Sequence, residues 1–123
     1  MKGILTGAGM ISIDVVLDVE GLLKSCKVTG HAGAGPGGSD IVCAAVSILT
    51  KTALKTLTDR EGIIVRVPAG VPERGRFGLE TDYTGKGRDF LAAVSAFLME
   101  GLVSVSEAYP GYCRMNIHKE RRN

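Results

Sequence analysis

The sequence predicts an α+β domain of two layers, a mixed or antiparallel sheet with two helices packed on one face. Three observations predict it: a pair of strand-like segments near the N-terminus, two long segments with helical spacing, and three further short strand-like segments. Their order is β-β-α-β-β-α-β. A chain of 123 residues can bury one modest core. We expect a single domain over residues 10–118, after a flexible extension over residues 1–9 and before a basic tail over residues 119–123.

The first two strands are predicted as a hairpin. Residues 11–19 alternate, with Ile or Val at most odd positions, which is typical of a strand with one buried face. Glu20-Gly21 offers a turn, and residues 22–30 pair back. The remaining strands are predicted at residues 63–67, which Pro68 ends, 77–83 and 113–118.

Two segments are predicted as helices. Ser39 and Asp40 are favoured N-cap residues and predict a helix that runs to about Leu57. This helix is apolar nearly all round, so we expect it to be the central buried helix. A second helix is predicted at roughly residues 88–103. Its apolar stripe is Phe90, Val94, Phe97, Leu98 and Leu102.

Composition limits the function classes. The net charge is +2, too small by itself to indicate a nucleic-acid or membrane partner, and we expect neither. No stretch approaches the ~18 apolar residues of a membrane helix, and residues 1–10 do not resemble a signal peptide. Three cysteines without CxxC spacing are typical of reduced thiols in a cytoplasmic protein. We expect no cofactor.

The chemistry is predicted between residues 30 and 47. Residues 30–38 hold five glycines between two ordered elements, so we interpret them as a functional loop. If Asp40 caps the helix, Cys43 is its third residue, where the helix dipole and unpaired N–H groups favour the thiolate. His31 has the pKa of a general base near neutral pH. Nucleophile, base and dipole could thus converge, with backbone N–H groups to stabilise an oxyanion.

Two further residues share the helix face of Cys43. Asp40, Cys43 and Ser47 are spaced at i, i+3 and i+7. Asp40 either orients His31 or only caps the helix. Ser47 either hydrogen-bonds within the site or bonds back to a carbonyl of the preceding turn, at Val42 or Cys43.

Other interpretations compete with catalysis. A lone cysteine in an apolar helix is usually a small core residue, and we interpret Cys26 and Cys113 in that way. His118 is expected to be solvated. His31 and Cys43 lack the spacing of a metal-ligand pair, so no metal is expected. The glycine-rich segment lacks the Gly-Lys-Ser/Thr ending of a phosphate loop and carries Asp40 instead.

The segment closely resembles the ribosomal-processing cysteine protease family, called Prp. The shared pattern is Gly30-His31-Ala32, a glycine-rich loop, and then Asp-Ile-Val-Cys-Ala-Ala-Val-Ser at residues 40–47. The resemblance implies that His31 and Cys43 are the catalytic pair, with Gly30, Asp40 and Ser47 at recurring positions around them. The loop glycines expected to border the substrate are Gly33, Gly35, Gly37 and Gly38.

The resemblance also implies a substrate and an assembly. The family removes an N-terminal extension from a bacterial large-subunit ribosomal protein, number twenty-seven, and cuts after an aromatic pair. Its members look like cytosolic homodimers. The alternative is a non-catalytic, ribosome-associated module whose glycine loop grips a peptide. For the enzyme, we expect the loop to close over the bound substrate as a lid does.

Overall fold

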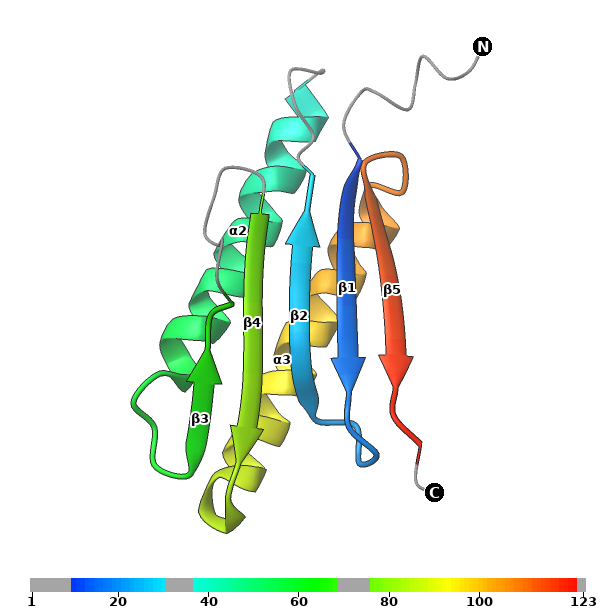
Figure 1. Ribbon diagram of the computed structural model, residues 1–123. Coiled ribbons are helices and arrows are strands. Elements are labelled where there is room, and N and C mark those ends of the chain that lie inside the picture. The colour runs from blue at the N-terminus through cyan, green and yellow to red at the C-terminus, as the bar shows by residue number, and fades with distance from the viewer. Residues whose placement is uncertain (1–9, 31–36, 69–75, 122–123) are drawn as a thin grey trace.

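A computed structural model describes residues 10–30, 37–68 and 76–121, which form a five-stranded sheet with two α-helices on one face (Figure 1). The strand order is β3-β4-β2-β1-β5. The predicted α+β class and element order are confirmed. The elements are β1 Ile11–Leu17, β2 Leu23–Thr29, α2 Gly37–Leu57, β3 Ile63–Arg66, β4 Arg76–Tyr83, the 3-10 turn η1 Gly85–Gly87, α3 Arg88–Ala108 and β5 Cys113–Lys119.

The sheet is mixed because one of its strand pairs is parallel and the others are antiparallel. β1 pairs antiparallel with β2, β2 with β4, and β4 with β3, whereas β5 pairs in parallel with β1. In the view of Figure 1, α2 lies behind β3 and β4, and α3 lies behind β2 and β1. The apolar face of each strand packs against these helices and forms the core. Its largest fully buried side chains include Ile11, Ile13, Leu23, Leu57, Leu79, Leu91, Leu98 and Leu102.

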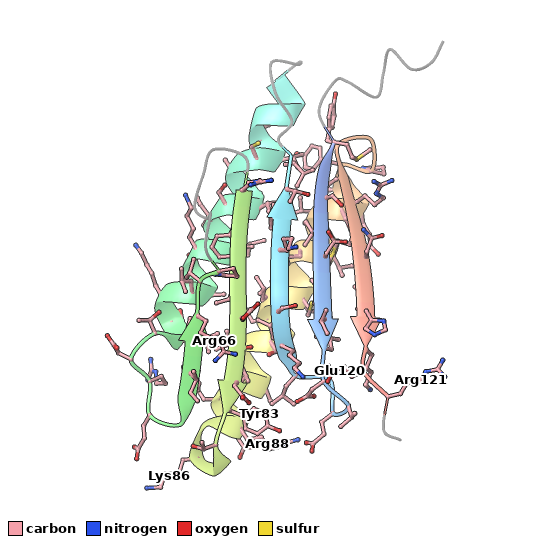
Figure 2. The ribbon with its side chains drawn as sticks, in the orientation of Figure 1. Arg66, Tyr83, Lys86, Arg88, Glu120 and Arg121 are labelled. Atoms are coloured by element: carbon pink, nitrogen blue, oxygen red, sulfur yellow. The ribbon has the colours of Figure 1, made fainter. Side chains whose placement is uncertain are left out.

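The opposite face of the sheet is polar. Strand alternation places Asp14, Lys27, Glu80 and Arg114 on it. The Asn116 amide donates to the Asp14 carboxylate at 2.9 Å. Figure 2 labels Arg66 and Glu120 near the lower end of this face, where they pair with Glu80 and Lys24 respectively. No described helix covers this face, so solvated charged groups there cost little.

The start of β2 is fixed by two buried hydroxyl groups. The Leu23 amide donates to Ser95 Oγ of α3 at 2.9 Å, and the Thr81 hydroxyl of β4 donates to the Leu23 carbonyl at 2.7 Å. The β1–β2 register shifts here, between Val16 and Leu17. The hydroxyls therefore satisfy backbone groups that a regular ladder would have paired.

Two glycines contact each other where β3 and α3 begin: Gly62 directly precedes β3, and Gly87 directly precedes α3. Gly62 has φ +80°, and a Cβ at Gly87 would overlap the Gly62 carbonyl oxygen. The Thr84 amide also donates to that carbonyl, at 2.9 Å. Only glycine permits this close approach of two backbones.

Both helices differ from their predicted bounds. α3 continues to Ala108 instead of ending near residue 103, because no proline interrupts it before Pro110 and its Gly101 packs against Leu49 of α2. α2 begins at Gly37, earlier than the predicted cap at Ser39 and Asp40. Glycine disfavours a helix by only about 1 kcal/mol per residue, which tertiary packing overrides.

Two expectations about burial are wrong. α2 is not buried all round, because Ile48 is 67% exposed, and Phe97 of the predicted core stripe of α3 is 73% exposed. Each helix covers the sheet with one side only. The stripe of α3 that faces the core is Leu91, Ser95, Leu98 and Leu102.

The α3 region also differs from the expectation that no segment approaches a membrane span. Residues Gly85–Ala108 are long and apolar enough to cross a membrane by length and composition, and 22% of the apolar window is buried. A helix that packs one side on a sheet passes the same test. The finding therefore shows that α3 is apolar on its outer side too, and it does not assign a membrane.

Candidate active site

Cys43 is the most accessible of the three cysteines. It is half-buried on α2 and packs against the edge of the core. Cys26 and Cys113 are buried, which confirms their interpretation as packing residues. Burial raises the pKa of the Cys26 thiol to about 12, helped by the nearby Asp14 carboxylate, and burial raises the pKa of Cys113 as well. These two thiols are therefore poor nucleophiles.

The position of Cys43 along α2 corrects the prediction from capping. α2 begins at Gly37, so Cys43 is in its second turn and Asp40 lies inside the first turn instead of capping it. The N–H groups without helical acceptors belong to the first turn. Gly37 and Gly38 are likewise helical and not part of the loop. Any stabilisation of the Cys43 thiolate by the helix dipole therefore acts from one turn away.

Gly30 directs the chain out of β2 just before His31. Its φ is +81°, and a Cβ there would lie 2.6 Å from the carbonyl oxygen of Met10. Any other residue would meet both backbone strain and this oxygen. The C-terminal end of β2 and the N-terminal end of α2 lie at the same end of the molecule (Figure 1). The family resemblance placed Gly30 beside the catalytic pair, and the structure explains why this residue is a glycine.

Several predicted site residues lie outside the described part of the chain. These are His31, Gly33 and Gly35, together with the side chain of Asp40. Their roles, and the closing loop, stay predictions. Ser47 is described: it is exposed and lies one turn after Cys43. Its carbonyl accepts a hydrogen bond from the Thr50 hydroxyl at 3.3 Å, so α2 is regular through this turn.

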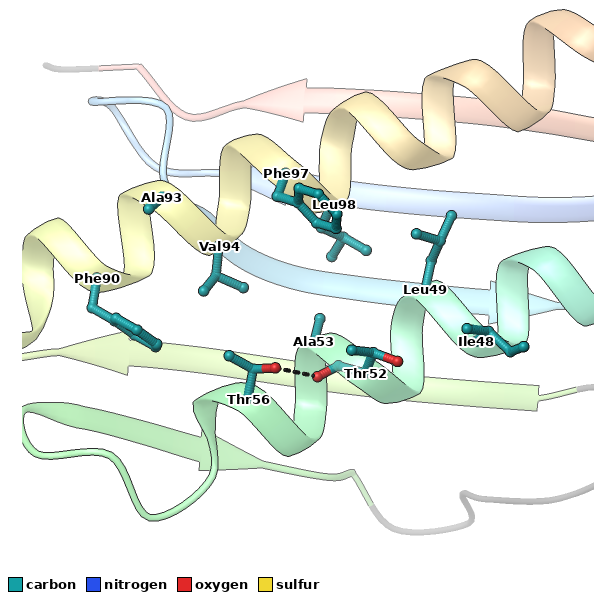
Figure 3. Close-up of a pocket in the computed structure, with 10 residues that line it drawn as sticks. All are labelled: Ile48, Leu49, Thr52, Ala53, Thr56, Phe90, Ala93, Val94, Phe97 and Leu98. Carbon is teal, nitrogen blue, oxygen red and sulfur yellow. Dashed lines mark hydrogen bonds between the residues drawn. The ribbon is translucent and has the colours of Figure 1, made fainter.

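The side of α2 that carries Cys43 faces away from α3. With 3.6 residues per turn, Ser47 lies about 40° around the helix from Cys43, whereas Thr52 lies about 180° from it. Thr52 lines an apolar groove between α2 and α3, with Leu49 and Ala53 (Figure 3). Cys43 and Ser47 are therefore on the opposite flank, toward the β3–β4 side of the sheet, which α2 covers.

The groove between the helices is lined almost entirely by apolar side chains. Its volume is about 570 Å³. Figure 3 shows Ile48 and Leu49 at the same end of it as Phe97 and Leu98, and Thr56 at the end near Phe90. The Arg60 guanidinium lies 4.2 Å from the centre of the Phe90 ring. The sequence indicated Phe90, Val94 and Phe97 as part of one apolar stripe but did not predict a groove.

A model of the protein family described as cysteine protease Prp matches residues 10–114. The chain belongs to this family. It is accordingly a cysteine protease, and the alternative of a non-catalytic module is not favoured. No protein of curated function matches the chain in sequence. Within the described residues, no cluster of three or more His, Cys, Asp or Glu side chains is arranged to hold a metal ion.

Solved structures share the fold. The SMU.848 protein of Streptococcus mutans is 28% identical, with a TM-score of 0.73 over 91% of this chain and 97% of that one. The essential ribosomal processing protease Prp of Staphylococcus aureus, in complex with a substrate peptide, is 21% identical, with a TM-score of 0.72 over 88% and 99% of the two chains. The same protease with a covalently linked product peptide is 22% identical, with the same TM-score and coverage.

Proposed function

We propose that this cysteine protease is an endopeptidase that removes the N-terminal extension of bacterial large-subunit ribosomal protein number twenty-seven, cutting after an aromatic pair. The observation that carries the proposal is the family motif, whose cysteine, Cys43, is the accessible thiol on the flank of α2. The ribosomal processing activity named for the Staphylococcus aureus relative supports the substrate class.

In the proposed reaction, His31 takes the proton of the Cys43 thiol. The thiolate sulfur attacks the scissile carbonyl carbon and forms a tetrahedral oxyanion. The C–N bond then breaks, and His31 donates the proton to the departing amine. Water, deprotonated by His31, attacks the thioester and releases the N-terminal fragment as a carboxylic acid and Cys43 as a thiol.

The oxyanion needs N–H donors close to Cys43. The unpaired amides of the first turn of α2 are the nearest helical donors, because the amide of Cys43 itself lies deeper in the helix. Asp40 and Ser47 flank Cys43 on the same helix face. Asp40 is proposed to orient His31, and Ser47 to support the site from one turn away.

The test is cleavage of a precursor peptide, read by mass spectrometry. Cys43→Ala and His31→Ala should each abolish cleavage and leave the fold intact, while Cys26→Ser and Cys113→Ser keep activity with some loss of stability from a buried hydroxyl. The peptide carries Phe-Phe as the aromatic pair before the cut. Replacing both Phe residues by Ala should remove most of the activity, because two aromatics supply much of the binding energy. Robust cleavage by Cys43→Ala would refute the proposal.

A limiting dose of iodoacetamide separates the enzyme from a peptide-binding module. An activated Cys43 should be alkylated fastest, and the buried Cys26 and Cys113 much more slowly. Alkylation without such selectivity would favour the module. We also place the protein in the cytoplasm, where thiols stay reduced.

The same proposal includes a homodimer that forms through the α2–α3 groove. Phe97 and Ile48 expose large apolar side chains there, and a patch of this kind on a soluble domain marks an interaction surface. The groove lies on the flank of α2 opposite to Cys43, so a second copy would leave the active site open. Such an interface is isologous, because the same patch serves both copies.

Light scattering after gel filtration tests the dimer. Phe97→Glu should convert a dimer to a monomer, because it places a carboxylate within the apolar patch. Ile64→Glu is the matched control: Ile64 is 45% exposed on β3, away from the groove, and the dimer should survive its replacement. A wild-type monomer at high micromolar concentration would contradict this part of the proposal.

A further inference from the structure

The two helices that form the groove carry charges of opposite sign. After its first turn, α2 contains two charged residues, and both are lysines, Lys51 and Lys55. After Arg88, α3 contains three charged residues, and all are acidic: Asp89, Glu100 and Glu107. All five side chains are exposed. The layer of helices therefore has a basic half and an acidic half, with the apolar groove between them.

The charged side chains lie on the side of the helices that faces away from the sheet. Both lysines lie about 140° to 180° around α2 from Val46, which is buried in the core. Asp89 and Glu100 lie about 160° to 180° around α3 from Leu98, which is buried too. They therefore border the outer opening of the groove, on the side that a second copy would contact.

At one end of the groove, a lysine and a carboxylate lie at the same level. Thr56 is at the end of the groove near Phe90 (Figure 3). Lys55 directly precedes Thr56 on α2, and Asp89 directly precedes Phe90 on α3. The two charges thus lie on either side of this end of the groove, one on each helix.

The other end of the groove repeats this arrangement. There, Leu49 of α2 packs against Gly101 of α3. Lys51 is two residues after Leu49, and Glu100 is one residue before Gly101. Because a helix rises about 1.5 Å per residue, Lys51 and Glu100 lie within about one turn of each other along the groove.

These charges are largely unused within one copy. In the part of the chain that the structure describes, no ion pair engages Lys51, Lys55 or Glu100. Asp89 pairs with its neighbour Arg88 at 3.1 Å and is otherwise almost fully exposed. Exposed charges around an apolar centre are typical of the rim of a protein interface.

We propose that two copies pack their helix layers face to face about a two-fold axis parallel to the helices, so that α2 of each copy lies against α3 of the other. Such an axis keeps every residue at its own level along the groove. Lys51 then pairs with Glu100 of the partner subunit, and Lys55 pairs with Asp89 of the partner subunit. Each pair occurs twice, on both sides of the apolar contact.

The charges exclude the other face-to-face arrangement. A two-fold axis perpendicular to the helices would place α2 on α2 and α3 on α3, so that lysines would oppose lysines and carboxylates would oppose carboxylates. The inference rests on the homodimer of the proposed function and adds which helices meet. An axis parallel to the helices also leaves the Cys43 ends of both copies at the same end of the dimer, so both active sites receive substrate from one side.

Charge reversal tests the arrangement, with the dimer dissociation constant Kd measured by sedimentation equilibrium. Lys51→Glu and Glu100→Lys should each raise Kd about tenfold or more, because the two-fold axis counts each substitution twice. The combined variant Lys51→Glu/Glu100→Lys should return Kd to within about threefold of wild type, since the pair is restored with its signs exchanged. Lys119→Glu, at an exposed position on β5, is the matched control and should leave Kd unchanged.

Failure of this inference is distinguishable from failure of the proposed function. Single reversals that leave Kd unchanged, in a dimer that Phe97→Glu still breaks, would overturn the arrangement and keep the groove as the interface. A combined variant no tighter than the single ones would also overturn it. A wild-type monomer would reject the dimer and this inference together. Cleavage of the precursor peptide is a separate measurement: its absence would reject the substrate and leave the result on Kd unaffected.

Discussion

The two ends of the sheet are built in different ways. One end holds the β1–β2 turn, η1 and the start of α3. It is closed by the Gly62–Gly87 contact and by the hydrogen bond that the Leu23 amide donates to the buried Ser95 hydroxyl. At the other end, β2 leaves the sheet at Gly30, α2 begins, and Cys43 is half-exposed. Figure 2 marks the first end with Tyr83, Lys86 and Arg88. The contrast indicates that stability is concentrated at the closed end and chemistry at the open end.

Gly87→Ala should have the largest effect, because the new Cβ would overlap the Gly62 carbonyl at the closed end. We expect a loss of about 4 kcal/mol in the free energy of unfolding, measured by urea denaturation. Gly85→Ala is the control, since a Cβ at Gly85 meets nothing within 4 Å. Similar stabilities of the two variants would contradict the closed end described above.

Gly30→Ala should affect activity more than stability. The substitution strains a backbone with φ +81° and displaces the chain that leads to His31, so kcat/KM should fall by about 100-fold, with about 2 kcal/mol of destabilisation. Gly21→Ala introduces a comparable strain at φ +91°, with nothing near its Cβ, at the closed end. It should cost stability alone; an equal loss of kcat/KM in both variants would remove the distinction between the ends.

Ser95→Ala should destabilise the protein by about 2 kcal/mol, because it leaves the buried Leu23 amide without its acceptor. The control is Ser104→Ala on the same helix, whose exposed hydroxyl donates to the Glu100 carbonyl and should change stability by less than about 0.5 kcal/mol. Thermal unfolding of both variants gives the comparison. If Ser95→Ala costs no more than its control, the buried hydroxyl does not fix β2.

Cys26 should give the smallest effect, seen only at alkaline pH. Its pKa in the folded protein is about 12, against an ordinary value of 9.0, so the unfolded chain loses this proton first as the pH rises. Stability from this group is complete below pH 9 and falls between pH 9 and 12. From pH 9 to pH 10 the loss is about 1 kcal/mol. Cys26→Ala should lose less than wild type over this interval; parallel losses would show that other groups dominate.

The strands were predictable because the alternation of apolar and polar residues indicates directly which face of a strand is buried. Ile11, Ile13 and Val15 show this in β1, and Phe77 and Leu79 in β4. The start of α2 was not predictable, because Gly37 and Gly38 favour a loop by local propensity and only packing makes them helical. Apolar spacing also did not reveal that Ile48 and Phe97 face outward, since it does not show on how many sides a helix is packed against other elements.

Features with a local sequence signal could likewise be predicted, and features built by two elements together could not. Cys43 was found from its motif, and Gly30 from its neighbour His31, because both signals are local. The apolar groove between α2 and α3 was missed, because the helical spacing within each segment does not show that the two helices lie side by side.

The parallel pairing of β1 with β5 has a consequence for synthesis of the protein. β1 is synthesised before the other described elements, and β5, its neighbour in the sheet, is synthesised after them. The β1–β2 hairpin forms from local contacts, but the side of β1 that pairs with β5 has no partner strand until β5 has been made. A nascent chain that stops before β5 therefore lacks a finished sheet.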